Sequence, residues 1–466
     1  MLAIPDLPET VSMSESPVSA ESLTRDPPTT FWGRFRHIGP SLILTATLVG
    51  SGELIITTSL GAELGFIALW IVVGSCLLKV AVQEALGRFV ISSGETSLAT
   101  LHRLPGPRFL AGWAVWIWLL VTLMTMAQLG GIVEVLGDSM VLALPKIGLS
   151  ADVWAPIVCA VAVILLLSGR YGLVERASML LVSLFSLSII ICGFLIQQTD
   201  YAVTGEQVLS GFTFELPESG GKALAVVAAV GLSATELIYY AYWCLEKGYA
   251  RFVGPNEDSP EWERRAKGWI RVMQLDCYFA MVVYTTTTVA FYFLGAGILH
   301  ARGEIPENNE VVEVLSSIYT ETIGPDAFYA FIACAFMVLF STIFVSIAST
   351  SRILPDCLEI FGLVTLKDTR TRYFWIRIFT VVLGLLYMSA ALVPANPVLK
   401  IILGLAPLGL MLPLICYAAL HVRYKRLDPR LRPSLVLDIW LWVSALLTVT
   451  LTIHAFVDLL VGGAHG

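Results

Sequence analysis

Charged residues are scarce in this chain, since Asp, Glu, Lys and Arg make up only 14% of its 466 residues. An ordinary soluble domain carries about 25%. Hydrophobic residues reach 56% of the sequence, and apolar runs of bilayer-spanning length recur along it. This composition argues against a soluble enzyme. It predicts an all-α polytopic protein embedded in a lipid bilayer, because helices satisfy their own backbone hydrogen bonds there.

Several chemical motifs are missing as well. The sequence has no Walker A motif and so gives no support to an ATP-driven pump. Its eight cysteines show neither disulfide nor metal-ligand spacing, and we interpret them as small core residues. Residues 1–32 are polar, lack the apolar core of a signal peptide, and are predicted to form a disordered cytoplasmic tail. We expect no cofactor, no enzymatic activity and no nucleic-acid partner. The sequence carries no signal for oligomeric state.

A transmembrane domain is expected over residues 33–466, with eleven candidate spans. They run over residues 39–60, 66–91, 110–136, 152–168, 175–197, 221–246, 268–298, 325–350, 373–392, 396–420 and 434–461. With the N-terminus inside, 23 of the 29 Lys and Arg residues fall in or beside inside loops, and only Lys146, Lys222 and Arg302 fall outside. This bias predicts a multi-pass protein of the cell (inner or plasma) membrane, with a cytoplasmic N-terminus and an external C-terminus.

The first and sixth spans carry similar sequences. The first has GSGELI, from Gly50 to Ile55, and the sixth has SATELI, from Ser233 to Ile238. Because the two spans are five apart, the second copy enters the membrane from the opposite side. This predicts an inverted repeat of five helices, over about 39–197 and 221–420, with an extra helix at 434–461. Inverted repeats place the binding site at the midplane, where discontinuous helices meet.

These two segments supply the candidate site. Small residues at Gly50, Ser51, Gly52 and Ala234 would let the helices unwind and free backbone groups for a ligand. Each buried carboxylate, Glu53 or Glu236, costs about 2.5 to 3.5 kcal/mol at the bilayer centre on insertion scales. The two costs are tolerable if both acids face one cavity and share a cation. We therefore predict Glu53 and Glu236 as ligands of a cation, or alternatively as buried acids bonded to the unwound backbone.

Residues 39–70, GPSLILTATLVGSGELIITTSLGAELGFIALW, resemble the first helix and following loop of the NRAMP divalent-metal transporters. That family has a Gly-Pro start, an Asp-Pro-Gly-Asn break and a downstream Gly-Ala stretch. The matching positions are Gly39, Pro40, Gly61, Ala62, Gly65, Phe66 and Trp70. The resemblance implies a LeuT-type fold, a metal-ion symporter as the general function, and Glu134 as a possible proton relay. A structural role for Glu134 at a contact between helices is the alternative.

The departures from the family are informative. The family's metal-binding Asp is Gly50 here, and its Asn is Glu53. In the sixth span Thr235 replaces the family's methionine, and Tyr242 replaces a histidine. Lys400 falls near the position of a polar ligand in the tenth span, where it lies in the cavity as a counter-ion or snorkels to the interface. An oxygen-only site is therefore expected, with weak or absent proton coupling.

Three functional classes remain open. The first is a transporter of a hard divalent cation of the Mg²⁺ or Mn²⁺ type. The second is a transporter of a small organic solute, an amino acid or amine, with Lys400 facing its acid group. The third is a non-transporting sensor on the same scaffold. A small carboxylate-lined cavity would favour the ion, and a larger one with aromatic walls would favour the solute. Lys79 is expected to pair with Glu84 or Glu63.

Overall fold

The computed structural model describes residues 24–48, 52–167, 171–214, 230–304, 311–366 and 368–462. Within these ranges the chain is helical apart from loops and one two-stranded antiparallel hairpin, in which Arg108 pairs with Gly112. Seven described helices are long and apolar enough to cross a membrane, and a bent pair of helices makes an eighth candidate. The seven are α4 (Leu69–Ser93), α6 (Trp113–Ala143), α13 (Pro260–Leu294), α16 (Ala327–Ile360), α17 (Thr369–Ala391), α18 (Pro397–His421) and α19 (Leu435–Gly462).

The remaining predicted spans also coincide with helices. They are the bent pair α2 (Pro40–Leu48) and α3 (Thr58–Leu64), then α7 (Ala151–Leu167), α8 (Tyr171–Leu195) and α11 (Ala234–Lys247). The polytopic helical fold is therefore confirmed, and the described helices follow the order expected for two five-helix repeats plus α19.

Each repeat contains a helix that begins in mid-span after residues that are not α-helical. In the first, α2 ends at Leu48, a π-helix, η2 (Gly52–Thr57), leads into α3, and the two helical segments meet at 46°. Two predicted site residues, Gly50 and Ser51, lie outside the described residues. In the second repeat, residues 230–233 are not helical and α11 starts at Ala234. Each repeat thus places a helix terminus at mid-span.

Helices α6 and α18 cross at very short range, because glycines lie at the contact. A Cβ atom on Gly404 would lie 2.5 Å from the Cβ atom of Gln128, and one on Gly131 would lie 2.7 Å from the carbonyl oxygen of Pro397. Real Cβ atoms do not come this close, so only glycine fits at these positions. The contact fixes the relative position of two helices that form walls of the cavity described below.

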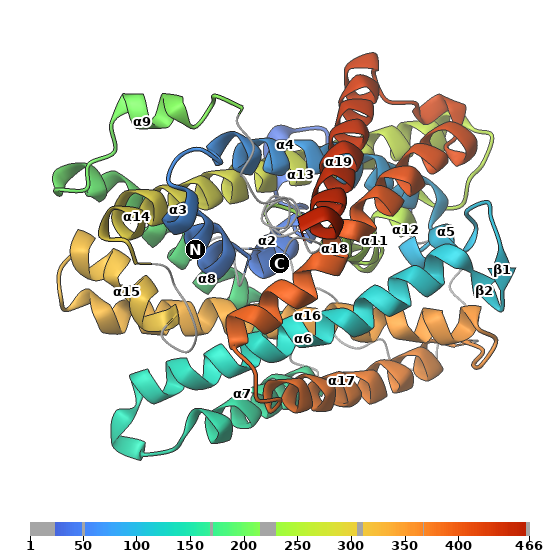
Figure 1. Ribbon diagram of the computed structural model, residues 1–466. Helices are drawn as coiled ribbons and strands as arrows, with labels where there is room; N and C mark the ends of the chain where they lie inside the picture. Colours follow the sequence, from blue (N-terminus) through green and yellow to red (C-terminus); the bar gives the residue numbers. More distant parts are fainter. Residues whose placement is uncertain are drawn as a thin grey trace.

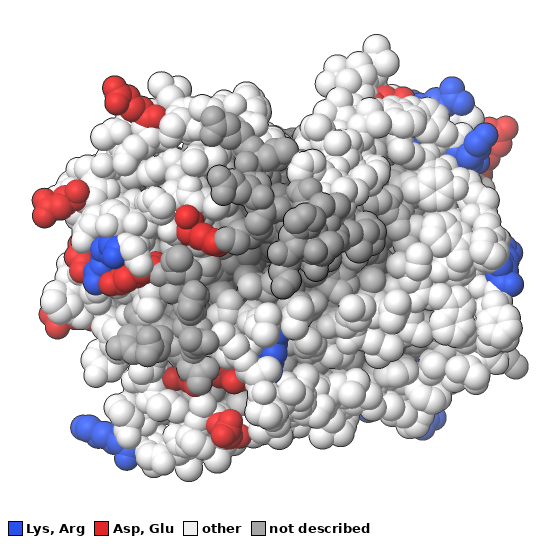
Figure 2. All heavy atoms as spheres, viewed as in Figure 1, with Lys and Arg blue, Asp and Glu red and all other residues white. Residues whose placement is uncertain are grey.

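The two ends of the helix bundle differ in charge. One end, named here the basic end, carries the short elements α1 (Phe31–Phe35), α5 (Ser97–His102), β1 (Arg108–Phe109), β2 (Ala111–Gly112), α12 (Tyr249–Val253), η7 (Val422–Arg426) and η8 (Pro429–Leu431). The other, the acidic end, carries η3 (Pro145–Ile147), η4 (Ile196–Gln198), α9 (Gly205–Ser210), η5 (Gly295–Leu299), α14 (His300–Arg302) and α15 (Val311–Thr322). Helices α5 and α12 lie at the right of Figure 1, and α9 and α15 at the left. Most of the visible basic side chains gather at the right and most of the acidic ones at the left in Figure 2.

Part of the predicted tail packs against the basic end. Residues 1–23 lie outside the described residues. The backbone N–H of Arg25 donates to the carbonyl of Phe252 at 3.0 Å, and the indole of Trp269 donates to the carbonyl of Arg25 at 2.9 Å. The segment just before α1 is therefore bound to α12 and α13.

Candidate functional site

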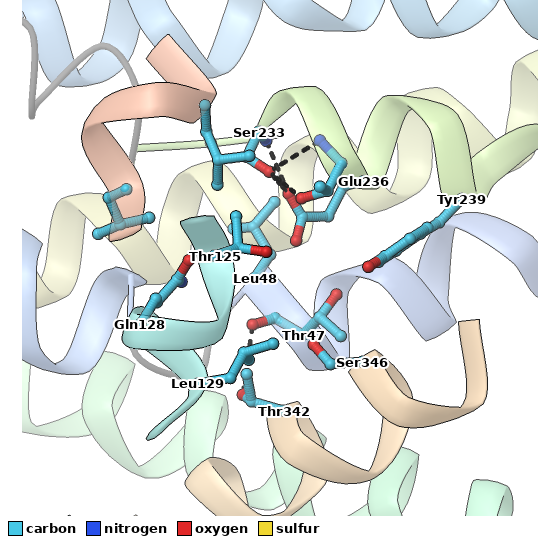
Figure 3. A pocket seen from close by; sticks show the side chains of 14 residues that line it. Thr47, Leu48, Thr125, Gln128, Leu129, Ser233, Glu236, Tyr239, Thr342 and Ser346 are labelled. Atoms are coloured by element: carbon cyan, nitrogen blue, oxygen red, sulfur yellow. Dashed lines mark hydrogen bonds between the residues drawn. The ribbon is translucent and has the colours of Figure 1, made fainter. Parts of the chain in front are cut away.

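A polar cavity lies where the two broken helices meet α6, α16 and α18 (Figure 3). The space open to the centres of water molecules is about 40 Å³, and by this measure one water needs about 10–15 Å³. The cavity therefore has room for a few waters or one partly hydrated ion. Its lining residues are Thr47, Leu48, Thr125, Gln128, Leu129, Gly231, Ser233, Thr235, Glu236, Tyr239, Thr342, Ser346, Leu405 and Leu408.

Oxygen dominates the chemistry of this lining. Six Ser and Thr hydroxyls, the Gln128 amide and the Tyr239 phenol surround the space, and Glu236 alone among the described lining residues carries a charge. Figure 3 shows the Tyr239 hydroxyl pointing into the space between Glu236 and Thr47. Hydroxyl, amide and carboxylate oxygens are ligands for hard cations, whereas softer metals favour thioether or imidazole ligands.

Glu236 has two tasks. It occupies the third position of α11 in a capping box: its Oε2 atom accepts the backbone N–H of Ser233 at 2.9 Å and also the Ser233 hydroxyl. These bonds satisfy free groups at the helix start. The Oε1 atom takes no part in the cap. Glu236 thus caps the second break and supplies the charge of the cavity.

Glu53 lies behind the cavity wall. Its side chain in η2 is fully buried, and its Oε1 atom accepts the hydroxyl of Thr288 at 2.9 Å. The backbone N–H of Gly231, at the second break, lies near the same carboxylate. Within the described residues, the Oε2 atom of Glu53 has no hydrogen-bond partner. Of the two acids, only Glu236 lines the cavity, and Glu53 links the first break to the second.

Lys79 of α4 approaches the same region from a third side. Its ammonium donates to the carbonyl of Val230 at 2.7 Å, and Ser75, one turn earlier, donates to the same carbonyl at 2.9 Å. The side chain is 3% exposed. Glu84, a partner expected from the sequence, forms an ion pair with Arg88 instead. Sequence reasoning missed the position of Lys79 because the contact spans about 150 residues of chain.

Lys400 and Glu134 pair with each other. The Lys400 ammonium lies 2.7 Å from Oε2 of Glu134 on α6 and 3.0 Å from the carbonyl of Ala391. Neither residue lines the cavity: both lie on α6 and α18 toward the acidic end, beyond the lining residues Leu129 and Leu405. The expected alternatives for Lys400, a cavity counter-ion or a snorkelling side chain, are replaced in the structure by an ion pair between two helices.

Hydroxyl groups of α16 support the first break. Ser341 donates to the carbonyl of Ala46 at 3.1 Å, and Thr342 donates to the carbonyl of Thr47 at 3.4 Å. The last carbonyls of α2 lack helical partners, and these bonds satisfy them. The spacing of Thr342 and Ser346, four residues apart on one helical face, was the available signal for a cavity wall.

No three His, Cys, Asp or Glu side chains form a metal-ligating cluster in the part of the chain that the structure describes. Of the remaining predicted site residues, Thr235 lines the cavity, Gly52 begins η2, and Ala234 is the first residue of α11. Sequence reasoning did not identify Thr125 and Gln128 of α6, which are three residues apart and face the same space.

A bent helix pair, α2 and α3, and a second helix that begins in mid-span, α11, lie beside a polar cavity, as in LeuT-type membrane proteins. The family description "Natural resistance-associated macrophage protein-like" matches residues 41–458, and the chain belongs to this family. Its similarity to curated proteins is lower. The "Divalent metal cation transporter MntH" of Mycobacterium tuberculosis is 23% identical over 286 residues, which are 60% of this chain and 62% of the relative. The chain thus matches a little under two thirds of that protein.

Solved structures confirm the fold. The Eremococcus coleocola manganese transporter, in complex with an aromatic bis-isothiourea compound, has a TM-score of 0.61 at 15% identity, covering 93% of this chain and 88% of the other. Mhp1, a nucleobase-cation-symport-1 family transporter, has a TM-score of 0.59 at 15% identity and covers 93% and 94% of the two chains. The amino-acid complex of MhsT with L-phenylalanine has a TM-score of 0.57 at 14% identity and covers 93% and 99%.

Proposed function

We propose that this protein is a secondary transporter, not an enzyme, and that it carries a hard divalent cation of the Mg²⁺ or Mn²⁺ type across the membrane. Family membership supports this proposal, as do the divalent-metal and manganese transporters among the similar proteins. The basic end would face the cytoplasm by the positive-inside rule. The N-terminus would then be cytoplasmic and the C-terminus external.

The observation that carries the proposal is the size and chemistry of the cavity. A volume of about 40 Å³ open to the centres of water molecules admits an ion with a few waters. Among the described lining residues the charged group is a single carboxylate, that of Glu236, surrounded by neutral oxygens. Mg²⁺ gives up its water reluctantly and is usually held by one or two carboxylates together with retained waters. The site therefore suits a partly hydrated divalent ion and would discriminate weakly among hard ions.

In this mechanism Glu236 is the charged ligand. Thr125, Gln128 and Thr235 would hold the waters of the ion, and the backbone of Gly50–Gly52 and Ala234 would complete the site. Glu53 would shape the wall rather than touch the cargo. Lys400 and Glu134 would hold α6 to α18, so that neither relays protons. Uptake would follow the gradient of the ion with weak or no proton coupling.

Purified protein in proteoliposomes, with a trapped Mg²⁺- or Mn²⁺-sensitive dye and a pH dye, tests the function. We expect uptake of both ions by the wild type, little acidification, and at least about a tenfold loss in Glu236→Gln, because the charged ligand is removed. The control is Glu261→Gln, at an exposed acid on the first turn of α13. Normal uptake in Glu236→Gln, or exclusion of Mg²⁺ together with strong acidification, would contradict the proposal.

A further inference from the structure

Three charged side chains from three helical elements converge on one short segment, residues 230–236. Lys79 of α4 donates to the carbonyl of Val230 at 2.7 Å. Glu53 of η2 lies near the next N–H group, that of Gly231. Glu236 accepts the N–H of Ser233 at 2.9 Å. The segment forms part of the cavity wall through Gly231, Ser233 and Thr235, so these charges act directly beside the cargo.

The burial of these groups demands charge compensation. Glu53 is 0% exposed and Lys79 is 3% exposed, and an isolated charge at such depth is strongly unfavourable unless an opposite charge lies near it. Lys79 interacts electrostatically with both Glu53 and Glu236. Counted at their formal charges, two carboxylates and one ammonium leave a single negative charge, and only Glu236 of the two acids lines the cavity.

We propose that Lys79 is a built-in counter-ion for Glu53: a cation fixed to the protein at the place where the two breaks meet, which leaves Glu236 as the one negative charge offered to the cargo. This inference rests on the proposed function as far as it concerns the cargo. Lys79 does not touch the cargo; it is a positioning residue that also sets the electrostatic potential of the cavity. The two acids then share a cation, as the sequence suggested, but that cation belongs to the chain.

Lys79 and Glu53 carry opposite charges, so replacing one or the other should shift the cation affinity in opposite directions, and replacing both should restore it. Lys79→Gln removes a positive charge beside the cavity and should tighten the binding of Mg²⁺ or Mn²⁺ by about tenfold. Glu53→Gln removes a negative charge, so that Lys79 offsets Glu236 instead, and it should weaken binding by about the same factor. The glutamine retains an acceptor for Thr288. In the double variant Glu53→Gln/Lys79→Gln the two effects should cancel, giving nearly wild-type affinity by calorimetry.

A purely structural role for Lys79 gives a different pattern. Loss of its bond to Val230 would weaken binding in Lys79→Gln, and the double variant would be worse than either single variant. That result, or shifts of the same sign in both single variants, overturns the proposal. Lys79→Arg keeps the charge and should bind as the wild type does. Lys146→Gln, at an exposed lysine of η3, is the matched surface control.

Thermal unfolding without cargo separates this proposal from the function. Each single variant removes one charge of a buried opposite-charge pair and should lower Tm, whereas the double variant should lose less than the sum of the two. If the wild type binds no divalent ion but this coupling is present, the function is wrong and the counter-ion assignment stands. Additive losses of Tm in the double variant would refute the assignment even if the ions bind. Should Lys79→Gln alone fail to fold, recovery of folding in the double variant supports the proposal, and failure of both refutes it.

Discussion

At the scale of single residues, Ser233 and Glu236 each have two roles. They cap the start of α11, and they also line the cavity. The Ser233 hydroxyl accepts the N–H of Thr235, and Glu236 accepts the N–H of Ser233. A capping box orients its glutamate with respect to the helix start, so the same bonds that begin α11 also place the charge of the cavity. Stability and cargo affinity are therefore linked at this position.

Removal of the cap should change both properties. Ser233→Ala is expected to destabilise the protein by about 1 kcal/mol and to weaken cargo binding, because Glu236 loses its orientation. The control is Thr204→Ala in the other capping box, formed by Thr204 and Gln207 on exposed α9. It should show a similar loss of Tm with unchanged affinity. If Ser233→Ala alters Tm alone, the cap does not position the carboxylate.

A substitution at Thr235 should change which metal ion the site prefers. A thioether at this position would add the soft ligand that the resemblance places there, and soft ligands favour later transition metals over Mg²⁺. Thr235→Met is therefore expected to raise the Mn²⁺ or Cd²⁺ affinity relative to that of Mg²⁺ by several-fold, as measured by competition in a binding assay. Thr235→Leu, of similar size without sulfur, is the control. Equal preferences in the two variants would show that the side chain does not contact the ion.

At the scale of elements, the crossing of α6 and α18 determines how close two cavity walls come. Gly404→Ala would place a methyl group 2.5 Å from the Cβ and backbone N atoms of Gln128. Overpacking of this kind costs about 1–3 kcal/mol or more, so we expect a marked fall in Tm and loss of uptake. Gly74→Ala on α4, where a Cβ meets nothing within 4 Å, should be neutral or slightly stabilising. Equal Tm values for the two variants would refute the close contact.

At the basic end, Arg430 attaches the loop between α18 and α19 to the rest of the protein. Arg430 bonds Asp428 and Asp258 and lies 4.6 Å from the ring centre of Trp262, which ties the loop between α18 and α19 to the start of α13. Its hydrogen bond lowers the pKa of Asp428 to about 2. Since this folded-state pKa lies below the ordinary value of 3.8, the stabilisation is complete above about pH 4 and is lost only as the pH falls toward 2.

Proteolysis at this loop should therefore be constant between about pH 8 and pH 5. Arg430→Gln is expected to increase cleavage near residues 427–432 at every pH in this range, because the loop loses its partners. Arg370→Gln, which removes a surface arginine from the first turn of α17, is the control. Cleavage of the wild-type loop that rises steeply below pH 7 would contradict the assignment of the ion pair.

At the scale of the whole molecule, the uneven distribution of charge predicts orientation. Seven of the eight cysteines are buried and Cys334 is half-buried, so Cys334→Ser gives a background with little labelling. A cysteine introduced at position 260 should react only after the membrane is permeabilised. One at position 310, which lies outside the described residues, should react in intact cells. The reverse labelling pattern would show that the predicted orientation in the membrane is wrong.

The helices could be predicted from sequence because a 20-residue apolar run has few alternatives in a bilayer. The two breaks could be predicted because small residues flank Glu53 and Glu236 in both repeats. The sequence could not predict which of the two acids faces the cavity, because the direction of a side chain beside a helix break does not follow from helical periodicity. Lys79, Gln128 and the Lys400–Glu134 pair depend on contacts between distant spans, for which one sequence carries no signal.

The bond between Lys79 and Val230 has an electrical consequence. An ammonium fixed to α4 stays with the protein when the cargo leaves, so in the proposed uncoupled mechanism each completed cycle would move only the two charges of the ion. Transfer of one charge through 100 mV releases about 2.3 kcal/mol, and two charges release about 4.6 kcal/mol. A carrier with an internal counter-ion would therefore be electrogenic, and a cell at that voltage could hold the ion at more than about a thousand times its external level.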